Sequence, residues 1–343
     1  MSPTLTSARA PVLKDWASQL LQKCGVQQAQ AEVTAHALVR TSLRGIDTHG
    51  IARLPSYIER LRAGDFNAKA QPAVASQNGL LRCHGDDGLG QVVVDQALKA
   101  SMLQAQCSAV VACSIEACGH LGALGVLLLP AVEAGFFAFL CQQTPPIMAL
   151  PGAHTAAIGN NPLAFSVPVN GKPPLVFDTA LSAAARGHIV DAARESGSAI
   201  PAEWALDVHG QPTTDPQAAL AGMLQPMAGY KGLGLAMLVQ CLAGSLCSTP
   251  PQASAVASSG SAGHLNAFLL LINPRLASSA DMFAMHTDAW LQGVASSSPA
   301  ARYPGERQHR CELERQREGI PIPDGLVHQL RGVSTQLGVT SPF

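Results

Sequence analysis

The sequence contains few aromatic rings and few charges of either sign. Phe, Trp and Tyr together make up 4% of the 343 residues, and charged residues make up 13% with a formal net charge of -1. Because no basic surplus is present, attraction to nucleic acid or to an anionic membrane is not expected. The scarcity of rings also argues against a platform that stacks nucleic-acid bases. The 47% apolar composition instead indicates a globular protein of one or two domains with a large core.

Metal-binding and disulfide patterns are also missing. The nine cysteines form no CxxC pair, their number is odd, and most stand in apolar surroundings. The 11 histidines show neither HExxH nor HxxxH spacing, so the sequence indicates no metal site. Residues 1–11 lack the layout of a signal peptide. We therefore expect buried free thiols in a reducing cytoplasm rather than disulfides or zinc.

One long apolar stretch needs a separate interpretation. Residues 121–141 contain a single charged residue, Glu133, so length alone would admit a membrane span. Pro130 and Gly135 divide the stretch, however, and a spanning helix should not be broken there. The pattern therefore predicts a helix, a turn and a short buried strand, and no insertion into a membrane.

Helical periodicity dominates both ends of the chain, and strand patterns are confined to its middle, from about residue 80 to 272. Helices are predicted at 12–24, 27–43, 56–63, 91–104, 182–193, 233–246, 279–291, 306–318 and 326–336. Strands are predicted at 108–115, 136–141, 163–167, 175–177 and 267–272, whereas 79–90 is rich in turn residues and 248–263 reads as a loop. The predicted fold class is mixed α/β, or α+β. A central mixed β-sheet domain at 77–278 would be joined by a helical domain formed by 1–76 plus 279–343.

The richest polar cluster is the loop Arg44–Pro55 between two predicted helices. It brings His49, whose ordinary pKa lies near neutrality, together with Arg53, whose planar guanidinium fits a carboxylate through two hydrogen bonds. Thr48 beside the histidine can orient its ring. A second interpretation is a capped helix start, in which Asp47 or Thr48 is the N-cap and His49 is a surface residue. On spacing alone the two interpretations have about equal support.

The glycine-rich phosphate-binding signatures are absent. No GxGxxG follows a predicted strand, and no GxxxxGK[ST] occurs. Two helix starts could still bind an anion through free backbone amides and a neighbouring cation, 229–232 with Lys231 and 302–307 with its arginines. Capped helices with solvated charges are the simpler interpretation of both. His120 and Asp178 each follow a predicted strand, where ligands of α/β proteins often bind, but each could equally be structural.

The order and spacing of several short stretches between residues 44 and 326 resemble one family, the malate/L-lactate dehydrogenases that are distinct from the Rossmann-type enzymes. The family also includes ureidoglycolate and sulfolactate dehydrogenases and a piperideine/pyrroline-2-carboxylate reductase. The matching stretches are RGIDTHGIARLPSY, DDGLGQ, GHLGALG, GNNPLAFSVP, FDTALSAAARG, IPAEWALDVHGQPTTDP, GYKGLGLAM, INP, RYPGERQ and GIPIPDGL. The resemblance implies hydride transfer with NAD or NADP as cofactor, a non-Rossmann cofactor site and a homodimer.

The resemblance also implies roles for individual residues. His49 would be the acid/base histidine, Thr48 its orienting neighbour, and His120 the proton acceptor of the ureidoglycolate branch. The implied substrate contacts are Arg53, which would hold the carboxylate, Asn160, Arg186 and Gly187. The implied cofactor contacts are His120, Leu121, Gly122, Ala123, Leu124, Asp178, Thr179, Ala180, Tyr230, Lys231, Arg302, Gly305, Glu306 and Arg307.

Three positions depart from the family pattern. Thr48 stands where Ser is usual, Asn160 where Thr is usual, and His188 where the imine reductase branch has an acidic residue. The changes at Thr48 and His188 weaken the imine reductase interpretation. We therefore expect oxidation of a small 2-hydroxy acid, or reduction of the 2-keto acid, of the malate, lactate, ureidoglycolate or sulfolactate type. The alternatives are an NADPH-dependent reductase of a cyclic imine 2-carboxylate and a non-catalytic protein that binds a cofactor or an acid.

Overall fold

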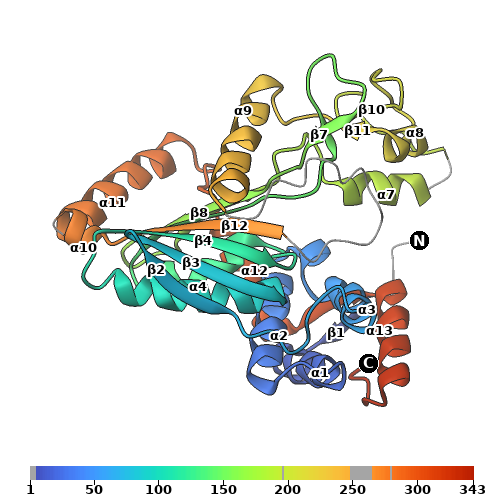
Figure 1. Ribbon diagram of the computed structural model, residues 1–343, viewed down its shortest axis with the longest axis horizontal. Coiled ribbons are helices and arrows are strands. Elements are labelled where there is room, and N and C mark those ends of the chain that lie inside the picture. The colour runs from blue at the N-terminus through green and yellow to red at the C-terminus, as the bar shows by residue number, and fades with distance from the viewer. Residues whose placement is uncertain (1–4, 195–196, 248–264, 279) are drawn as a thin grey trace.

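The computed structural model describes residues 5–194, 197–247, 265–278 and 280–343. Its elements form a central sheet, a small second sheet and a group of helices near both ends of the chain (Figure 1). The fold class is mixed α/β, as the sequence pattern predicted. The predicted loop at 248–263 lies outside the described residues.

The central sheet has seven strands in the order β2-β3-β4-β12-β5-β8-β9. β3 and β4 run parallel and the other neighbours run antiparallel, so the sheet is mixed. The strands are β2 (Ala73–Gln77), β3 (Leu80–Gly88), β4 (Val110–Cys118), β5 (Phe137–Gln142), β8 (Leu163–Val167), β9 (Leu175–Thr179) and β12 (Leu265–Ile272). The turn-rich interpretation of 79–90 is wrong, because β3 runs through it. Asp86 and Asp87 adopt positive φ there, where the pairing with β4 is irregular.

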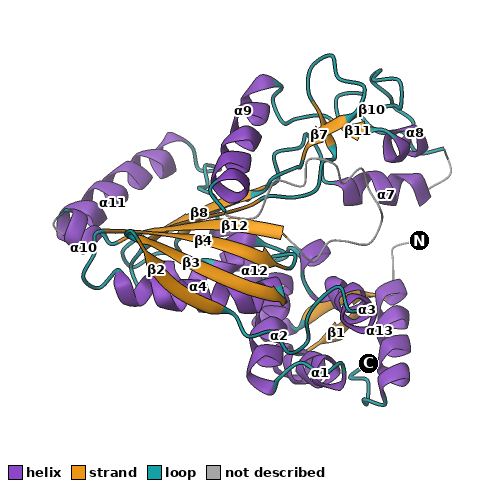
Figure 2. Ribbon diagram, viewed as in Figure 1, coloured by secondary structure: helices purple, strands orange, loops and turns teal. Residues whose placement is uncertain are grey.

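Helices cover both faces of this sheet (Figure 2). Phe268 and Leu269 of β12 are successive residues and therefore point to opposite faces. On the Leu269 face, α4 (Gly90–Gln104) packs through Val93 and Leu98. On the Phe268 face lie α9 (Tyr230–Val239) and a π-helical turn, η3 (Gln240–Ser245).

A small four-stranded sheet lies beyond α9, with two helices next to it (Figure 1). Its strands, in the order β10-β11-β6-β7, are β10 (Ala205–Leu206), β11 (Met223–Leu224), β6 (Met148–Ala149) and β7 (Ala156–Ile158). The helices are α7 (Arg186–Arg194) and α8 (Pro216–Ala221). Together with α9 they form one apolar cluster that includes Met148, Ile189, Ala219 and Leu233.

The long apolar stretch forms the helix, turn and strand that were predicted. α5 (Leu124–Leu127) and α6 (Leu129–Glu133) are followed by a turn at Gly135 and by β5. Pro130 occupies the first turn of α6, where its missing N–H is tolerated. In the described ranges, no helix combines the length and the apolar character that crossing a membrane requires.

The two ends of the chain lie together. α1 (Ala10–Lys23), α2 (Gln28–Leu43), α3 (Leu54–Ala63) and α13 (Asp324–Leu337) share a core that includes Leu13, Leu20, Leu38, Leu54 and Leu330. Beside them, β1 (Leu5–Ala8) pairs antiparallel with β13 (Ile320–Pro323). The prediction that strands are confined to the middle of the chain is therefore wrong. Each of these strands has only 4 residues, which is too short to show an alternating pattern.

Two longer helices complete the fold after α10 (Pro274–Ala277). α11 (Ala280–Ser297) packs through Leu291 against Leu175 of β9. α12 (Glu306–Glu318) lies against α2, where the Glu312 carboxylate accepts hydrogen bonds from Arg44 at 2.7 Å and Arg40 at 3.0 Å. Arg44 and Glu312 are both buried. This pair fixes the beginning of the loop 44–55 to α12.

Candidate active site

The loop 44–55 is not a simple helix start. Two 3-10 turns, η1 (Asp47–His49) and η2 (Ile51–Arg53), separate α2 from α3. Arg53 occupies the N-cap position of α3, and no side chain caps that helix. The interpretation of Asp47 or Thr48 as the cap is therefore wrong.

The loop folds back closely on α2. At Gly50, an added Cβ would lie 2.1 Å from the Ser42 hydroxyl oxygen, so only glycine fits. The same hydroxyl accepts a hydrogen bond from the backbone N–H of Ile51 at 2.9 Å. From the other side, the Arg315 guanidinium of α12 donates to both oxygens of the Asp47 carboxylate, at 2.6 and 3.0 Å. Asp47 therefore anchors the loop, and His49 is presented between two fixed points.

A cavity of about 670 Å³ opens beside this loop. Ten of the predicted site residues line it: Thr48, His49, His120, Gly122, Ala123, Asn160, Asp178, Thr179, Ala180 and Arg307. They come from the loop, from the segment after β4, from the segment between β7 and β8, from the end of β9 and from the start of α12. Its volume is in the usual range for small-molecule sites, which makes it the candidate active site.

Two histidines face each other in this cavity. The ring centroids of His49 and His120 are 5.9 Å apart. Burial lowers the pKa of His49 to about 4, and the Arg53 guanidinium acts in the same direction. Burial lowers the pKa of His120 to about 3, with His49 and Arg53 adding to the effect. Both rings are therefore neutral near pH 7, so each can donate and accept hydrogen bonds.

Each histidine has a hydroxyl partner at Nδ1. The Thr48 Oγ1 lies 3.0 Å from Nδ1 of His49, and the Tyr57 hydroxyl lies 2.9 Å from Nδ1 of His120. The Tyr57 hydroxyl also accepts a hydrogen bond from Gln91 Nε2 at 3.0 Å. Because both Nδ1 atoms are occupied, the Nε2 edges of the two rings are the ones available to a ligand.

Arg53 does not line the cavity itself. Its Nε donates to the backbone oxygen of Thr48 at 2.7 Å. Among the described residues it forms no ion pair with a carboxylate. Its positive charge nevertheless lowers the pKa values of His49 and His120. A guanidinium so placed can bind an anionic group next to the two rings.

Asp178 also lines the cavity, near the end of β9. It accepts a hydrogen bond from the backbone N–H of Gly125 at 2.8 Å, in the first turn of α5. Burial raises the pKa of Asp178 to about 6, although this hydrogen bond acts in the opposite direction. The Asp178 carboxylate thus joins the end of β9 to the first turn of the earlier helix α5.

Asn160 and its neighbour Asn161 are held by Thr144 and by α9. The Thr144 hydroxyl donates to the Asn160 side-chain oxygen at 2.8 Å. Asn161, fully buried beside it, accepts from the Thr144 N–H at 3.0 Å and donates to the Ala236 carbonyl at 2.9 Å. The Ala236 carbonyl lies in α9 and also accepts from the backbone N–H of Gln240, the first residue of η3. The cavity wall is thus tied to α9.

The other predicted site residues do not line the cavity. Leu121 and Leu124 are buried in the core of the central sheet. Arg186 and Gly187 begin α7, and Tyr230 and Lys231 begin α9. Arg302 donates to the Pro299 and Ala301 carbonyls, and the Glu306 carboxylate accepts from the Tyr303 N–H. Gly305 packs against β9, where a Cβ would meet the Pro174 carbonyl oxygen at 2.7 Å.

Several residues near the site were not found by sequence reasoning. Gln142, the last residue of β5, and Thr144 just after it line the cavity, and a polar run at a strand end is a signal that could have found them. Tyr57 and Gln91 reach His120 from α3 and α4. Nothing in the sequence spacing indicates that contact. His188, noted only as a departure, also lines the cavity.

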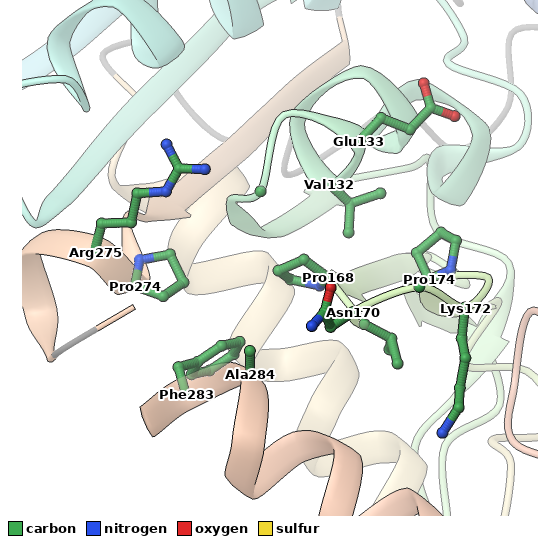
Figure 3. Close-up of a pocket in the computed structure, with 13 residues that line it drawn as sticks. Val132, Glu133, Pro168, Asn170, Lys172, Pro174, Pro274, Arg275, Phe283 and Ala284 are labelled. Atoms are coloured by element: carbon green, nitrogen blue, oxygen red, sulfur yellow. The ribbon is translucent and has the colours of Figure 1, made fainter. Parts of the chain in front are cut away.

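A second cavity of about 490 Å³ lies on a different part of the surface, between α6, the turn at 168–174 and α11 (Figure 3). Two of its three charged lining residues, Glu133 and Lys172, already serve structural pairs. Glu133 is bound by Arg40, and Lys172 lies 3.6 Å from the Asp288 carboxylate. None of the predicted site residues lines it. In the described part of the chain, no group of three His, Cys, Asp or Glu side chains gathers to hold a metal ion.

Comparison with known proteins places this geometry in a family. The profile of the malate/L-lactate dehydrogenases matches residues 9–331. The chain is 33% identical to the (2R)-3-sulfolactate dehydrogenase (NADP(+)) of Chromohalobacter salexigens over 314 residues, which cover 91% of this chain and 93% of that protein. It is also 33% identical to the ureidoglycolate dehydrogenase (NAD(+)) of Escherichia coli over 320 residues, which cover 90% of both.

The fold supports the same assignment. The crystal structure of delta1-piperideine-2-carboxylate reductase from Pseudomonas syringae superposes with a TM-score of 0.88 at 28% identity, covering 96% of this chain and 99% of that one. The family match spans the loop 44–55, both cavity histidines and Asp178. The chain therefore belongs to the malate/L-lactate dehydrogenase family.

Proposed function

We propose that the protein is an NAD(P)-dependent oxidoreductase that interconverts a small 2-hydroxy acid and its 2-keto acid. The observation that carries this proposal is the pair of neutral histidines, His49 and His120, in one cavity beside the Arg53 guanidinium. A neutral imidazole can take or give the hydroxyl proton, and a guanidinium can hold the carboxylate two bonds away. The relatives named above carry out chemistry of this class.

The residues of the cavity fit a nicotinamide dinucleotide. The Asp178 carboxylate, bonded to Gly125 through one oxygen, can accept a hydrogen bond from a ribose hydroxyl. Arg307 lines the cavity at the start of α12, where a cation and helix amides can bind a phosphate. Lys231 at the start of α9 would be a second such cation. When bound, the nicotinamide supplies hydride transfer.

The protein's own residues supply position and proton transfer. Arg53 would hold the substrate carboxylate, and the fixed loop would place the substrate hydroxyl against the histidine edges. Thr48 would orient His49 through the contact at Nδ1. Asn160, Arg186 and Gly187 are proposed as further substrate contacts, of which Asn160 lines the cavity.

We test the activity by absorbance at the reduced-nicotinamide band, with NAD and NADP each offered malate, lactate, ureidoglycolate and sulfolactate, and with the reverse reaction on the keto acids. Turnover of one hydroxy acid is the expected result. Turnover of a cyclic imine 2-carboxylate alone would replace the proposal by the imine reductase alternative. Calorimetric binding of a cofactor without turnover of any compound would favour the non-catalytic alternative.

We propose further that two copies of the chain form a homodimer through α9. From Gly232 to Cys247 no residue is charged, α9 exposes Leu235, Met237 and Leu238, and Leu246 is exposed directly after η3. A helix that is apolar on all sides normally lies between two packed bodies. Leu238, 47% exposed, would lie in such an interface.

The expected organisation and location are part of the same proposal. The unit 1–76 plus 279–343 would supply the proton-transfer loop, and the unit 77–278 would supply most cofactor contacts. Support comes from the cavity, which Thr48 and His49 line from one range and Asn160 and Asp178 from the other. A cytoplasmic location agrees with the free buried thiols of the chain, which a reducing compartment preserves.

A further inference from the structure

Either His49 or His120 could take the substrate proton. A chain of hydrogen bonds behind His120 decides between them. The chain begins at Gln91, which is 2% exposed in the first turn of α4. It continues through the hydroxyl of Tyr57, also 2% exposed, and ends at Nδ1 of His120. The three residues belong to α4, to α3 and to the segment after β4, so these hydrogen bonds depend on the tertiary fold and not on a local turn.

The direction of the chain is set at Gln91. Its Nε2 lies 3.0 Å from the Leu121 carbonyl oxygen and 3.4 Å from the His120 carbonyl oxygen. Carbonyl oxygens only accept hydrogen bonds, so the amide nitrogen and not the amide oxygen must face them. The same nitrogen lies 3.0 Å from the Tyr57 hydroxyl, to which it also donates. The Gln91 Oε1 has no described partner, which shows that the donors of this amide decide its orientation.

The Tyr57 oxygen therefore accepts from Gln91, and its own proton is free to be donated. The two acceptors near it are Nδ1 of His120 at 2.9 Å and the His120 carbonyl oxygen at 3.4 Å. The shorter and better contact is the one to Nδ1. A nitrogen that accepts this hydrogen bond carries no proton, so the proton of the neutral ring is on Nε2.

We propose that Gln91 and Tyr57 are positioning residues that hold neutral His120 with its proton on Nε2, so that His120 donates a hydrogen bond to the substrate oxygen and His49 carries the proton. The proposal rests on the proposed function. His120 lines the cavity and Tyr57 does not, which leaves the Nε2 edge to the ligand.

The division of roles balances the reaction. In the oxidative direction the hydroxyl proton passes to His49, and the C2 hydrogen leaves with its electron pair as the hydride already assigned to the nicotinamide. The Nε2–H of His120 stabilises the negative charge that builds on the oxygen between these events. Burial keeps Tyr57 protonated, because it raises the pKa of that hydroxyl to about 12, so the donor to Nδ1 is present throughout the working range.

Gln91→Glu provides the sharpest test, because it has the same shape but replaces the donor by a group that accepts from Tyr57. A carboxylate there accepts a hydrogen bond from the Tyr57 hydroxyl. A protonated carboxyl group donates its single proton to Leu121 and still accepts from Tyr57. In both cases the Tyr57 oxygen must accept from His120, and the ring proton moves to Nδ1.

The measurement is nitrogen NMR of protein with ¹⁵N-labelled histidine, with the His120 signals identified by their loss in His120→Asn. No substrate or cofactor is added, so the result does not depend on the proposed activity. We expect an unprotonated Nδ1 in the unaltered protein and a protonated Nδ1 in Gln91→Glu. A protonated Nδ1 in the unaltered protein, or the same tautomer in both, overturns the proposal.

Tyr57→Phe tests the same chain if Gln91→Glu does not fold. Without the hydroxyl, the ring is expected to populate both tautomers, and kcat to fall on the order of tenfold to a hundredfold with little change in KM. Ser334→Ala is the control, because it removes another buried hydroxyl, the acceptor of the Trp16 indole N–H. A kcat for Tyr57→Phe as high as that of Ser334→Ala would remove the positioning role.

Discussion

Arg315 in α12 binds the Asp47 carboxylate in the loop 44–55 through both ends of its guanidinium, at 2.6 and 3.0 Å. The same guanidinium donates to the Ser42 carbonyl oxygen at the end of α2. Asp47 is separated from His49 by one residue. A helix from the far end of the sequence therefore controls where the proposed proton carrier lies, through a planar contact that an ammonium group cannot reproduce.

We expect Arg315→Lys to lower turnover several-fold and to destabilise the fold by up to about 1 kcal/mol, the usual upper range for a half-exposed pair. Steady-state kinetics and urea unfolding measure the two effects. Lys99→Ala is the matched control, because it removes the 2.7 Å pair with Asp95 in α4 at a distance from the cavity. Equal turnover in Arg315→Lys and Lys99→Ala would show that the contact with Asp47 does not position the loop.

His49→Ala should reduce turnover by on the order of a hundredfold or more, because general acid–base groups contribute that much. The cofactor should bind with unchanged affinity, which fluorescence of the reduced nicotinamide measures. His84→Ala is a suitable control, since His84 lies in β3 and does not line the cavity. If turnover falls by less than twofold, another group carries the proton.

Acid should destabilise the protein partly through His49. Its pKa is about 4 when folded and about 6.5 when unfolded. Between these values the unfolded chain binds more protons, so stability is present above pH 6.5 and is lost as the pH falls toward 4. The melting temperature of His49→Gln should consequently fall less than that of the unaltered protein between pH 6.5 and 4.5. Parallel curves for the two proteins would contradict the lowered pKa.

Asp178→Asn should stabilise the cofactor-free protein at pH 8 while weakening cofactor binding. Burial raises the pKa of Asp178 from 3.8 to about 6. Between pH 3.8 and 6 the folded state therefore binds more protons than the unfolded state, and stability is lost as the pH rises through this range. The expected gain at pH 8 is on the order of 1 kcal/mol. The neutral amide oxygen can still accept from Gly125.

Asp207→Asn is the opposing control for this experiment. Two backbone N–H groups, of Gln211 and His209, hold the pKa of the exposed Asp207 below its usual range, so its ionised form favours folding. This variant should not gain stability at pH 8. Thermal unfolding measures both effects. If both variants lose stability, the ionised Asp178 carboxylate does not destabilise the folded state.

Leu238→Glu should convert the proposed dimer into a monomer, because two charges would meet in an apolar contact. Light scattering coupled to gel filtration measures the mass directly. Leu103→Glu is the control, since Leu103 in α4 is 76% exposed and lies away from α9. If Leu238→Glu is still a dimer, the interface does not include Leu238. If the unaltered protein is a monomer, the homodimer proposal is wrong.

Much of the fold was accessible from periodicity, because most helices and the central strands bury one regular face. The helix predicted at 306–318 matches the bounds of α12, and the strand at 163–167 matches those of β8. β1 and β13 were missed because their pairing joins positions more than 300 residues apart, such as Leu5 and Pro323, and contains two prolines. No local pattern encodes a contact of that separation.

The candidate site was predictable where its residues adjoin in sequence and not where packing brings them together. Thr48 and His49 are neighbours, so their contact followed from the loop itself. Tyr57 and Gln91 reach His120 only after α3 and α4 have packed, and each reads as an ordinary helical residue in the sequence. Asp178 was found, but its partner Gly125 lies in an earlier helix, a relation that only the fold establishes.

The pairing of β1 with β13 has a consequence for synthesis of the chain. β1 leaves the ribosome before its partner at Ile320–Pro323, and more than 300 residues separate the two strands. The central sheet, whose last strand ends at Ile272, has its strands complete before that moment. The pair β1–β13 and the loop 44–55, which Arg315 anchors, must therefore assemble after the central sheet, so that the growing chain acquires its proposed proton-transfer loop only once α12 has emerged.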